Sequence, residues 1–222
     1  MSQYKVVEKF VSINGEGVFA GQLAVFIRFQ GCNLNCSYCD TAWANKETTI
    51  FTMMTEEQIY HYIKKTGIKN VTLTGGEPLL NPEMIQLLQV LAGDRELHVE
   101  IETNGSIDLS IFTQISNPPA FTMDYKLPGS FMESKMLISN FRLLTKKDTV
   151  KFVVGDLVDL DCARDIITRN QLISKCHVYI STVFGKIRLD EVVEYMIKNT
   201  MNGITLQLQM HKIIWDPNRR GV

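Results

Sequence analysis

The stretch Gly31-Cys32-Asn33-Leu34-Asn35-Cys36-Ser37-Tyr38-Cys39-Asp40-Thr41 holds three of the five cysteines of this chain, in the spacing Cys-x3-Cys-x2-Cys. The apolar run at 24–29, just before it, is typical of a β-strand. We therefore expect a short loop that presents three thiols as the chain leaves the end of a strand. The chemistry of these thiols decides what kind of site the other strands and helices support.

The spacing of the three cysteines indicates a metal cluster. A loop this short can wrap its sulfurs around one polynuclear centre, and an ordinary cluster of four irons takes four thiolates. Because Cys32, Cys36 and Cys39 supply three, one iron of a 4Fe–4S cluster would keep an open position, as a catalytic metal does. A structural zinc site needs a fourth ligand, yet the nearest histidine, His61, lies beyond a separate helical segment. A disulfide framework fails because three thiols this close cannot all pair, and no signal peptide is visible.

Composition and charge narrow the class of protein. At 222 residues with a hydrophobic fraction of 45%, one domain over residues 1–222 is expected. The net charge of −1 gives no electrostatic reason to bind nucleic acid or an anionic membrane, and no apolar run approaches the roughly 20 residues of a membrane span. No targeting segment is visible, so we expect a cytoplasmic protein, where a reducing environment suits iron-bound thiolates. Cys162 and Cys176 are expected to be small buried hydrophobic residues.

Strands and helices alternate along the rest of the chain, which predicts an α/β fold. The expected helices are 55–65, opened by a capping box of Thr55 and Gln58, then 82–92, 132–144, 158–170 and 189–198. The expected strands are 4–10, 24–29, 70–73, 98–102, 120–123, 149–154, 177–180 and 204–208. Their apolar character suits burial on both faces of a parallel sheet. Because a complete eightfold barrel takes about 250 residues, we predict an incomplete, open parallel (βα) barrel of about six or seven strands.

Several groups of polar or glycine residues directly follow predicted strands. They are the cysteine loop, Gly75-Gly76-Glu77-Pro78, Glu102-Thr103-Asn104-Gly105 and Asp124-Tyr125-Lys126. In parallel α/β architectures the carboxyl ends of the strands share one edge, and sites form there. We therefore expect these segments to converge on one mouth of the barrel.

The spacing Cys-x3-Cys-x2-Cys resembles the signature of the radical S-adenosylmethionine enzymes. A wider pattern, running from the N-terminus to the last residues, resembles the 7-carboxy-7-deazaguanine synthase family of that superfamily. Its clearest parts are Ser12-Ile13-Asn14-Gly15-Glu16-Gly17, Gly21, Val25-Phe26-Ile27-Arg28, Gly31-Cys32-Asn33-Leu34 and Cys39-Asp40-Thr41. The resemblance implies a lyase of queuosine and 7-deazapurine biosynthesis. It implies that a 5′-deoxyadenosyl radical removes hydrogen from 6-carboxy-5,6,7,8-tetrahydropterin, whose ring contracts with loss of ammonia to give 7-carboxy-7-deazaguanine.

The resemblance further implies that S-adenosylmethionine binds beside the cluster. The residues that match the family's cofactor site are Tyr38, Cys39, Asp40, Gly76, Glu77, Glu102, Asp124, Tyr125 and Lys126. Without the resemblance, Gly75-Gly76-Glu77 is a tight strand-to-helix turn and Glu102 is an exposed edge carboxylate. Asp124 and Lys126 would then form a surface ion pair of little energetic value.

The resemblance also assigns a magnesium ion and a substrate site. Thr41 would bind Mg²⁺, which prefers oxygen ligands, although a helix N-cap is the alternative role for this hydroxyl. Residues that match the family's substrate site are Ile13, Asn14, Gly15, Glu16, Arg28, Thr74, Gln209 and His211. On the residues alone, 14–17 is a plain hairpin turn, Arg28 pairs with Glu16 or another acid, and His211 is structural.

Partners follow from the same resemblance, and two other functions stay open. We expect a reducing electron donor such as a flavodoxin, a small carboxypterin substrate and a homodimer. The main alternative is a glycyl-radical-enzyme activase, which shares the short chain and the cysteine spacing but acts on a glycine of a protein. Such an enzyme would not need the loop at 14–17, or Arg28, to hold a small carboxylate. The third possibility is a non-enzymatic iron–sulfur or zinc-binding module.

Overall fold

One sheet forms the frame of the computed structural model, which describes residues 2–222. Across these residues it has nine strands in the order β3-β1-β2-β4-β5-β6-β7-β8-β9. They are β1 (Tyr4–Ile13), β2 (Leu23–Phe29), β3 (Thr52–Met54), β4 (Asn70–Gly75), β5 (His98–Thr103), β6 (Ala120–Tyr125), β7 (Thr149–Val154), β8 (His177–Thr182) and β9 (Thr205–Leu206). β1 runs antiparallel to β2 and β3, whereas β2 and β4 to β9 pair in parallel. The predicted open parallel barrel is therefore confirmed, since neither edge strand pairs with the other.

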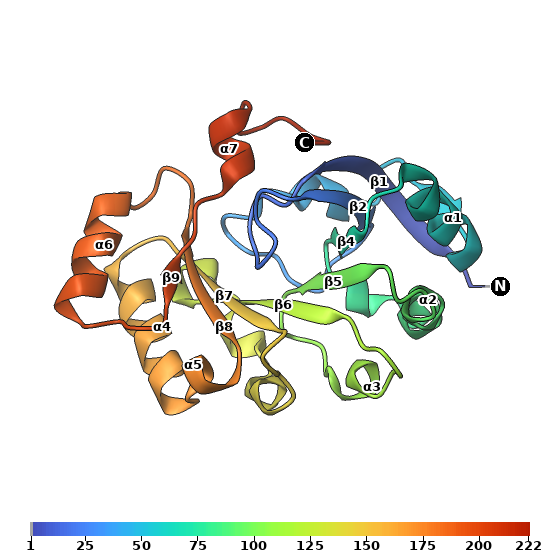
Figure 1. The fold of residues 1–222 in the computed structure, drawn as a ribbon. Coiled ribbons are helices and arrows are strands. Elements are labelled where there is room, and N and C mark those ends of the chain that lie inside the picture. The colour runs from blue at the N-terminus through green and yellow to red at the C-terminus, as the bar shows by residue number, and fades with distance from the viewer. Residues whose placement is uncertain (1) are drawn as a thin grey trace.

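The helices lie mainly outside the curved sheet. They are α1 (Glu56–Thr66), α2 (Met84–Ala92), α3 (Ser110–Thr113), α4 (Leu157–Arg169), α5 (Leu172–Lys175), α6 (Leu189–Lys198) and α7 (Met210–Ile214). Figure 1 shows α1 to α6 around the outside of the sheet, with α7 and the C-terminus at the top of the view. The predicted capping box opens α1: Gln58 N–H donates to Thr55 Oγ1 (3.2 Å), and Thr55 N–H donates to Gln58 Oε1 (2.9 Å). None of the helices in residues 2–222 has the length and apolar character that a membrane crossing requires.

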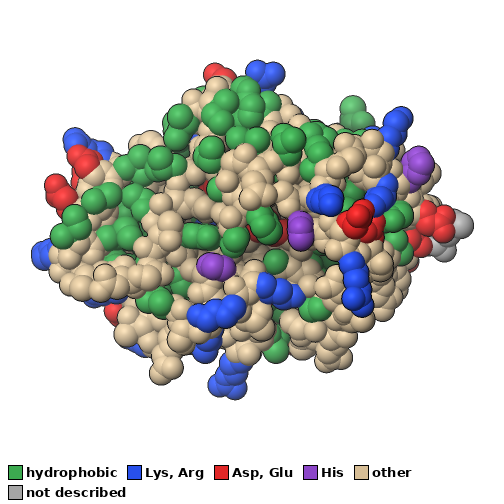
Figure 2. All heavy atoms as spheres, in the orientation of Figure 1, with side chains coloured by type: hydrophobic (Ala, Val, Ile, Leu, Met, Phe, Trp, Pro, Cys, Tyr) green, Lys and Arg blue, Asp and Glu red, His purple; other side chains and the backbone are tan. Residues whose placement is uncertain are grey.

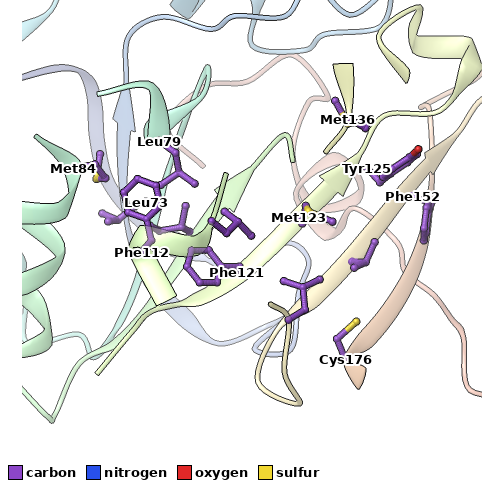
Figure 3. Close-up of a cluster of buried hydrophobic side chains, with 14 of the residues drawn as sticks. Leu73, Leu79, Met84, Phe112, Phe121, Met123, Tyr125, Met136, Phe152 and Cys176 are labelled. Atoms are coloured by element: carbon purple, nitrogen blue, oxygen red, sulfur yellow. The ribbon is translucent and has the colours of Figure 1, made fainter. Parts of the chain in front are cut away.

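The strands present an apolar face outward and a polar face inward, because successive side chains of a strand alternate in direction. On β6, Phe121 and Met123 are buried in the outer layer, whereas Thr122 and Asp124 face an inner cavity. Figure 3 shows part of that outer layer, where strand residues pack with side chains of the covering segments: Leu73, Phe121, Phe152, Leu79, Met84, Phe112 and Met136. The core therefore lies between sheet and helices, and the inner face is free to carry polar groups.

The loop at 14–22, between β1 and β2, crosses the open side of the barrel. Asn14 Oδ1 accepts a hydrogen bond from Thr72 Oγ1 (3.0 Å) on β4. At the far side, the Gln207 side chain accepts from Gly17 N–H (2.9 Å) and donates to Gly17 O (3.0 Å). Gly17 has a φ of 84°, a left-handed conformation that glycine adopts without a steric penalty. The loop thus links the two ends of the sheet through side-chain and backbone hydrogen bonds.

Two predicted elements differ in the structure. The helix predicted over 132–144 is wrong, because this segment makes two short 3-10 turns, Glu133–Lys135 and Ile138–Arg142. Hydrogen bonds to another loop determine the backbone path of this segment, because Leu137 N–H and the buried Asn140 side chain both donate to Gly105 O. The last strand, predicted over 204–208, is limited to β9, since Gln207 turns to the loop at 14–22. No periodic pattern in the sequence marks the short elements β3, α3, α5 and α7.

We expect Asn140→Ala to lower the free energy of unfolding by about 2–4 kcal/mol. The change removes the side-chain partners of the Ile107 carbonyl and the Leu109 N–H inside the core. Urea denaturation measures it. Asn202→Ala, at an exposed position, is the matched control and should stay within about 0.5 kcal/mol of the parent. Equal stability of the two variants would show that Asn140 does not hold this segment.

Candidate active site

A cavity of about 650 Å³ opens at the carboxyl ends of the parallel strands. The segments expected to converge on one mouth do so, together with the loop at 14–22 and the C-terminal residues 217–222. Most of the predicted site residues line the cavity: Ile13, Asn14, Gly15, Glu16, Arg28, Cys32, Cys36, Tyr38, Cys39, Asp40, Thr41, Thr74, Gly76, Glu102, Asp124, Lys126, Gln209 and His211. The parallel topology therefore assembles one polar chamber from widely separated parts of the chain.

Two glycines hold the cysteine loop close to the turn after β4. A Cβ atom on Gly76 would lie 2.1 Å from the Gly31 carbonyl oxygen and 2.2 Å from Asn45 Oδ1, so a side chain does not fit there. Gly75 has a φ of 145° and an equally close backbone neighbour, with its Cβ position 2.3 Å from Phe29 O. Glu77 N–H donates to Gly31 O (2.8 Å) and joins the two segments. The glycine pair thus sets where the cysteine loop begins.

The three cysteines of the loop are free thiols, half-buried in the cavity wall. The Cys32 sulfur accepts hydrogen bonds from Leu34 N–H (3.4 Å) and from Asn104 Nδ2 (3.6 Å). Hydrogen bonds to cluster sulfurs and cysteine ligands adjust the reduction potential of iron–sulfur centres. Asn104 was not predicted to belong to the site, although it follows β5 in the expected Glu102-Thr103-Asn104-Gly105 segment.

Glu77 lies behind the cavity wall, which differs from the expected contact with the cofactor. Its carboxylate accepts hydrogen bonds from Leu79 N–H (3.0 Å), Thr103 Oγ1 (3.0 Å) and Asn104 N–H (2.6 Å). Burial raises the pKa of Glu77 to about 7, against the opposite effect of these bonds. Glu77 therefore connects the turns after β4 and β5 through hydrogen bonds.

Tyr125 also differs from the expectation, because its side chain is in the outer core. Its ring centroid lies 5.6 Å from that of Phe141 and 5.7 Å from that of Phe152, and Figure 3 shows it beside Phe152. Burial raises the pKa of Tyr125 to about 12. The alternation of β6 sends its neighbours, Asp124 and Lys126, to the cavity instead.

Asp124 and Lys126 form an ion pair of 2.8 Å in the cavity wall. Their side chains are only 22% and 13% exposed, so this is not the solvated surface pair that the sequence alone allowed. Asp124 Oδ1 is buried and has no hydrogen-bond partner within residues 2–222. A buried carboxylate oxygen without a donor is suited to accept one from a bound ligand. The Lys126 ammonium lies 5.9 Å from the centre of the Tyr38 ring, at the cysteine loop.

A second buried ion pair joins Glu16 to Lys151, a residue that was not predicted to belong to the site. Lys151 Nζ lies 3.2 Å from Glu16 Oε2, and Glu16 also accepts from Ser181 Oγ (2.5 Å) and Gln209 Nε2 (3.3 Å). Burial alone would raise the pKa of Glu16, but these three partners hold it below its usual value. The sequence signal that could have identified Lys151 is a charged residue inside an otherwise apolar strand, β7, just as Arg28 lies inside β2.

Arg28 pairs with Glu8 and not with Glu16. The Nε–Oε2 distance is 3.0 Å, and both side chains line the cavity. The sequence allowed Arg28 to pair with Glu16 or with another acid, and the second alternative holds. The neighbouring strands β1 and β2 place Glu8 opposite Arg28. On the adjoining strands, Thr74 Oγ1 donates to Glu102 Oε2 (2.6 Å), so Glu102 lies inside the cavity rather than at an exposed edge.

Thr41 and His211 both line the cavity. Thr41 precedes a 3-10 turn, Ala42–Asn45, but its hydroxyl makes no capping hydrogen bond and lies 3.7 Å from Cys39 Sγ. The hydroxyl is thus available to a ligand or a metal ion. The His211 ring lies against Gly15, where a Cβ would be 2.6 Å from Nδ1, and burial lowers the pKa of His211. The C-terminal tail lines the same cavity, with the Arg220 guanidinium 4.0 Å from the centre of the Trp43 ring.

The donor set suits a polynuclear cluster better than a single ion. In the part of the chain that the structure describes, no group of three or more His, Cys, Asp or Glu side chains is arranged to hold one metal ion. A cubane binds each cysteine at a different iron, so its ligands need not converge on one point. Three free thiols, the glycine pair and the unpartnered Asp124 oxygen fit a cluster with a polar organic cofactor beside it.

Comparison with known proteins defines the class first. A family model described as the radical SAM superfamily matches residues 26–116, which contain the cysteine loop and the glycine pair. Together with the full-length relatives of the chain, this match makes it a radical S-adenosylmethionine enzyme, a class that uses a 4Fe–4S cluster and S-adenosylmethionine.

The relatives then define the family. A 7-carboxy-7-deazaguanine synthase of Clostridium acetobutylicum is 60% identical over 219 residues, which cover 99% of each chain. The enzyme of the same name from Chlorobaculum tepidum is 33% identical over 98% of this chain and 96% of its own. The chain therefore belongs to the 7-carboxy-7-deazaguanine synthase family. The crystal structure of QueE from Escherichia coli has the same fold, with a TM-score of 0.75 at 22% identity over 94% of this chain and 95% of that one.

We expect Gly76→Ala to destabilise the protein by about 1–3 kcal/mol and to lower the iron bound after anaerobic reconstitution, because the added methyl group pushes the cysteine loop away. Iron analysis and thermal unfolding measure both effects. Gly155→Ala is the matched control, since its Cβ would meet only ordinary contacts, the nearest at 3.5 Å. Normal iron content in Gly76→Ala would contradict this account of the loop.

Proposed function

We propose that this chain converts 6-carboxy-5,6,7,8-tetrahydropterin to 7-carboxy-7-deazaguanine with loss of ammonia, and that residues 1–222 act as one catalytic unit. The single observation that carries the proposal is 60% identity to a named 7-carboxy-7-deazaguanine synthase over 99% of both chains. The cavity agrees with it, because free cysteines and buried charged pairs line the same chamber.

The cofactor site in this proposal lies at the cysteine loop. Cys32, Cys36 and Cys39 would hold the cluster, which together with S-adenosylmethionine supplies the radical that starts the reaction. The chain would bind the polar groups of S-adenosylmethionine through cavity-lining residues, namely Tyr38, Cys39, Asp40, Gly76, Glu102, Asp124 and Lys126. Asp124 is suited to this because one of its oxygens lacks a donor. Glu77 and Tyr125 would support the site from behind, through Asn104 and through the packing of β6.

The substrate site in this proposal lies deeper, between β2 and the loop at 14–22. Arg28 and Thr74 project from adjacent strands, while Ile13, Asn14, Gly15 and Glu16 come from the end of β1 and the loop. The Arg28 guanidinium matches the planar carboxylate of a carboxypterin. Gln209 and His211 would close this side, since Gln209 already contacts Glu16. The Thr41 hydroxyl would help Mg²⁺ hold the substrate carboxylate.

The proposal also includes the cellular compartment, the electron donor and the oligomeric state. Iron-bound thiolates suit the reducing cytoplasm, and the cluster needs an electron donor such as a flavodoxin. A homodimer is part of the proposal, and exposed apolar side chains support it. On α7, Ile213 and Ile214 are 66% and 51% exposed. Figure 2 shows hydrophobic side chains gathered over the upper part of the molecule, where Figure 1 places α7.

Anaerobic incubation of the reduced enzyme with the carboxypterin and S-adenosylmethionine should yield 7-carboxy-7-deazaguanine and ammonia, read by mass spectrometry. Cys36→Ala should abolish turnover, because the cluster loses one of three thiolates. Cys162→Ala is the matched control, since this thiol lies at α4 against Glu133 and away from the cavity. Absence of the product from the parent enzyme, or equal turnover in both variants, would overturn the proposal.

We expect Thr41→Ala to raise the Mg²⁺ concentration for half-maximal stimulation by at least about 10-fold, because an oxygen ligand is lost. Thr41→Ser keeps the hydroxyl and should behave like the parent. Initial rates across a magnesium titration measure the effect. Turnover and metal dependence that do not change in Thr41→Ala would assign this hydroxyl a purely local role beside Cys39.

A further inference from the structure

We propose that Lys151 is a positioning residue for substrate binding: it holds the Glu16 carboxylate ionised and in one orientation inside the cavity, where Glu16 accepts hydrogen bonds from N–H groups of the bound heterocycle. The inference rests on the proposed function, because it takes the carboxypterin as the ligand. It adds to that function a residue for which the sequence pattern gave no role.

The contacts to Glu16 come from three other parts of the chain. Glu16 belongs to the loop at 14–22, Lys151 to β7, Ser181 to β8 and Gln209 to the segment before α7. Lys151 is 8% exposed, and the side chain of Glu16 is 12% exposed. A buried carboxylate with three donors from three elements has one fixed orientation. Because Glu16 and Lys151 both line the cavity, this orientation decides what the cavity wall offers to a ligand.

The charges around the pair show why a cation is needed at this place. The titratable groups that face the Glu16–Lys151 pair are Glu100 and Glu102 from β5, Asp124 from β6 and His211 from α7. Glu102, Asp124 and Glu16 are all carboxylates close to Lys151, and burial lowers the pKa of His211, so the ring supplies little positive charge near neutral pH. Lys151 is thus the cation nearest to Glu16. Without it, burial and the neighbouring carboxylates would all favour protonation of Glu16.

An ionised carboxylate matches the edge of a pterin. That edge carries an amino group beside ring nitrogens, and a carboxylate that only accepts hydrogen bonds pairs with such N–H donors. A protonated Glu16 would present its own O–H to the same groups and lose part of the match. Lys151 acts through Glu16 in this arrangement, because its ammonium is a donor and does not complement another donor.

The test measures the Kd of 6-carboxy-5,6,7,8-tetrahydropterin by anaerobic calorimetry, with S-adenosylmethionine present and the cluster left oxidised so that no turnover occurs. At each pH between about 5 and about 8, the Kd of a variant is compared with that of the parent, because Glu77 and Glu100, whose pKa values are raised to about 7, titrate in both, while Glu16 of the parent stays ionised. Relative to the parent, Lys151→Met should bind about 10- to 100-fold more weakly at the acidic end and recover as the pH rises, since burial raises the pKa of Glu16 when no cation opposes it. Lys151→Arg, which keeps the charge, should restore most of the affinity.

Control variants separate this role from general stabilisation. Lys147→Met removes a lysine that bonds only the Pro118 carbonyl, outside the cavity, and should leave Kd and its pH dependence unchanged. Glu16→Gln and the double variant Glu16→Gln/Lys151→Met should bind equally, because Lys151 has no effect once the carboxylate is gone. This pair decides the question even where Lys151→Met alone fails to fold.

Each remaining outcome contradicts one proposal. A parent enzyme that does not bind the carboxypterin refutes the proposed function itself. A parent that binds, with a Lys151→Met variant of equal affinity at every pH, refutes only the role of Lys151. A double variant that binds more weakly than Glu16→Gln would make Lys151 a direct substrate ligand instead, which also overturns the inference.

Discussion

The close contact between the turn after β4 and the backbone at the start of the cysteine loop is the constraint on which the site depends. Gly76 has no room for a side chain against the Gly31 carbonyl, and the Glu77 N–H bonds to that same oxygen. The buried Glu77 carboxylate then fastens the next turn, at Thr103 and Asn104. Through these bonds β2, β4 and β5 present their carboxyl ends as one rigid wall, and the three thiols take their places from it.

The charged side chains of the cavity are also held in fixed positions by protein partners. Arg28 and Lys151 lie on the inner faces of β2 and β7, and Lys126 directly follows β6. They are paired with Glu8, Glu16 and Asp124, respectively. Isolated charges would be costly inside a cavity, whereas paired ones persist and offer fixed directions to a ligand. The helices bury the apolar outer face, so this polar chamber does not compromise the core. Binding groups are thus held in place before any ligand arrives.

Much of this arrangement could be predicted from the sequence, because local signals carry it. The capping box at Thr55, the apolar strands and the cysteine spacing are properties of short segments, and the structure places them as expected. The segment at 132–144 could not be predicted, since a buried Asn140 bonded to another loop overrides its helical character. Tertiary contacts also decide that the Glu77 carboxylate is bonded to Asn104 and that Tyr125 packs in the core, so the sequence could not show either.

The sequence by itself determined the class of fold, the three-thiol loop and the family, because strand periodicity, residue spacing and similarity to relatives are all written along the chain. Tertiary structure alone decided the partners of the buried charges. Arg28 pairs with Glu8, and Glu16 pairs with Lys151, 135 positions away. Such pairs depend on strand register and on the path of the loop at 14–22, and these are fixed only when the whole sheet forms.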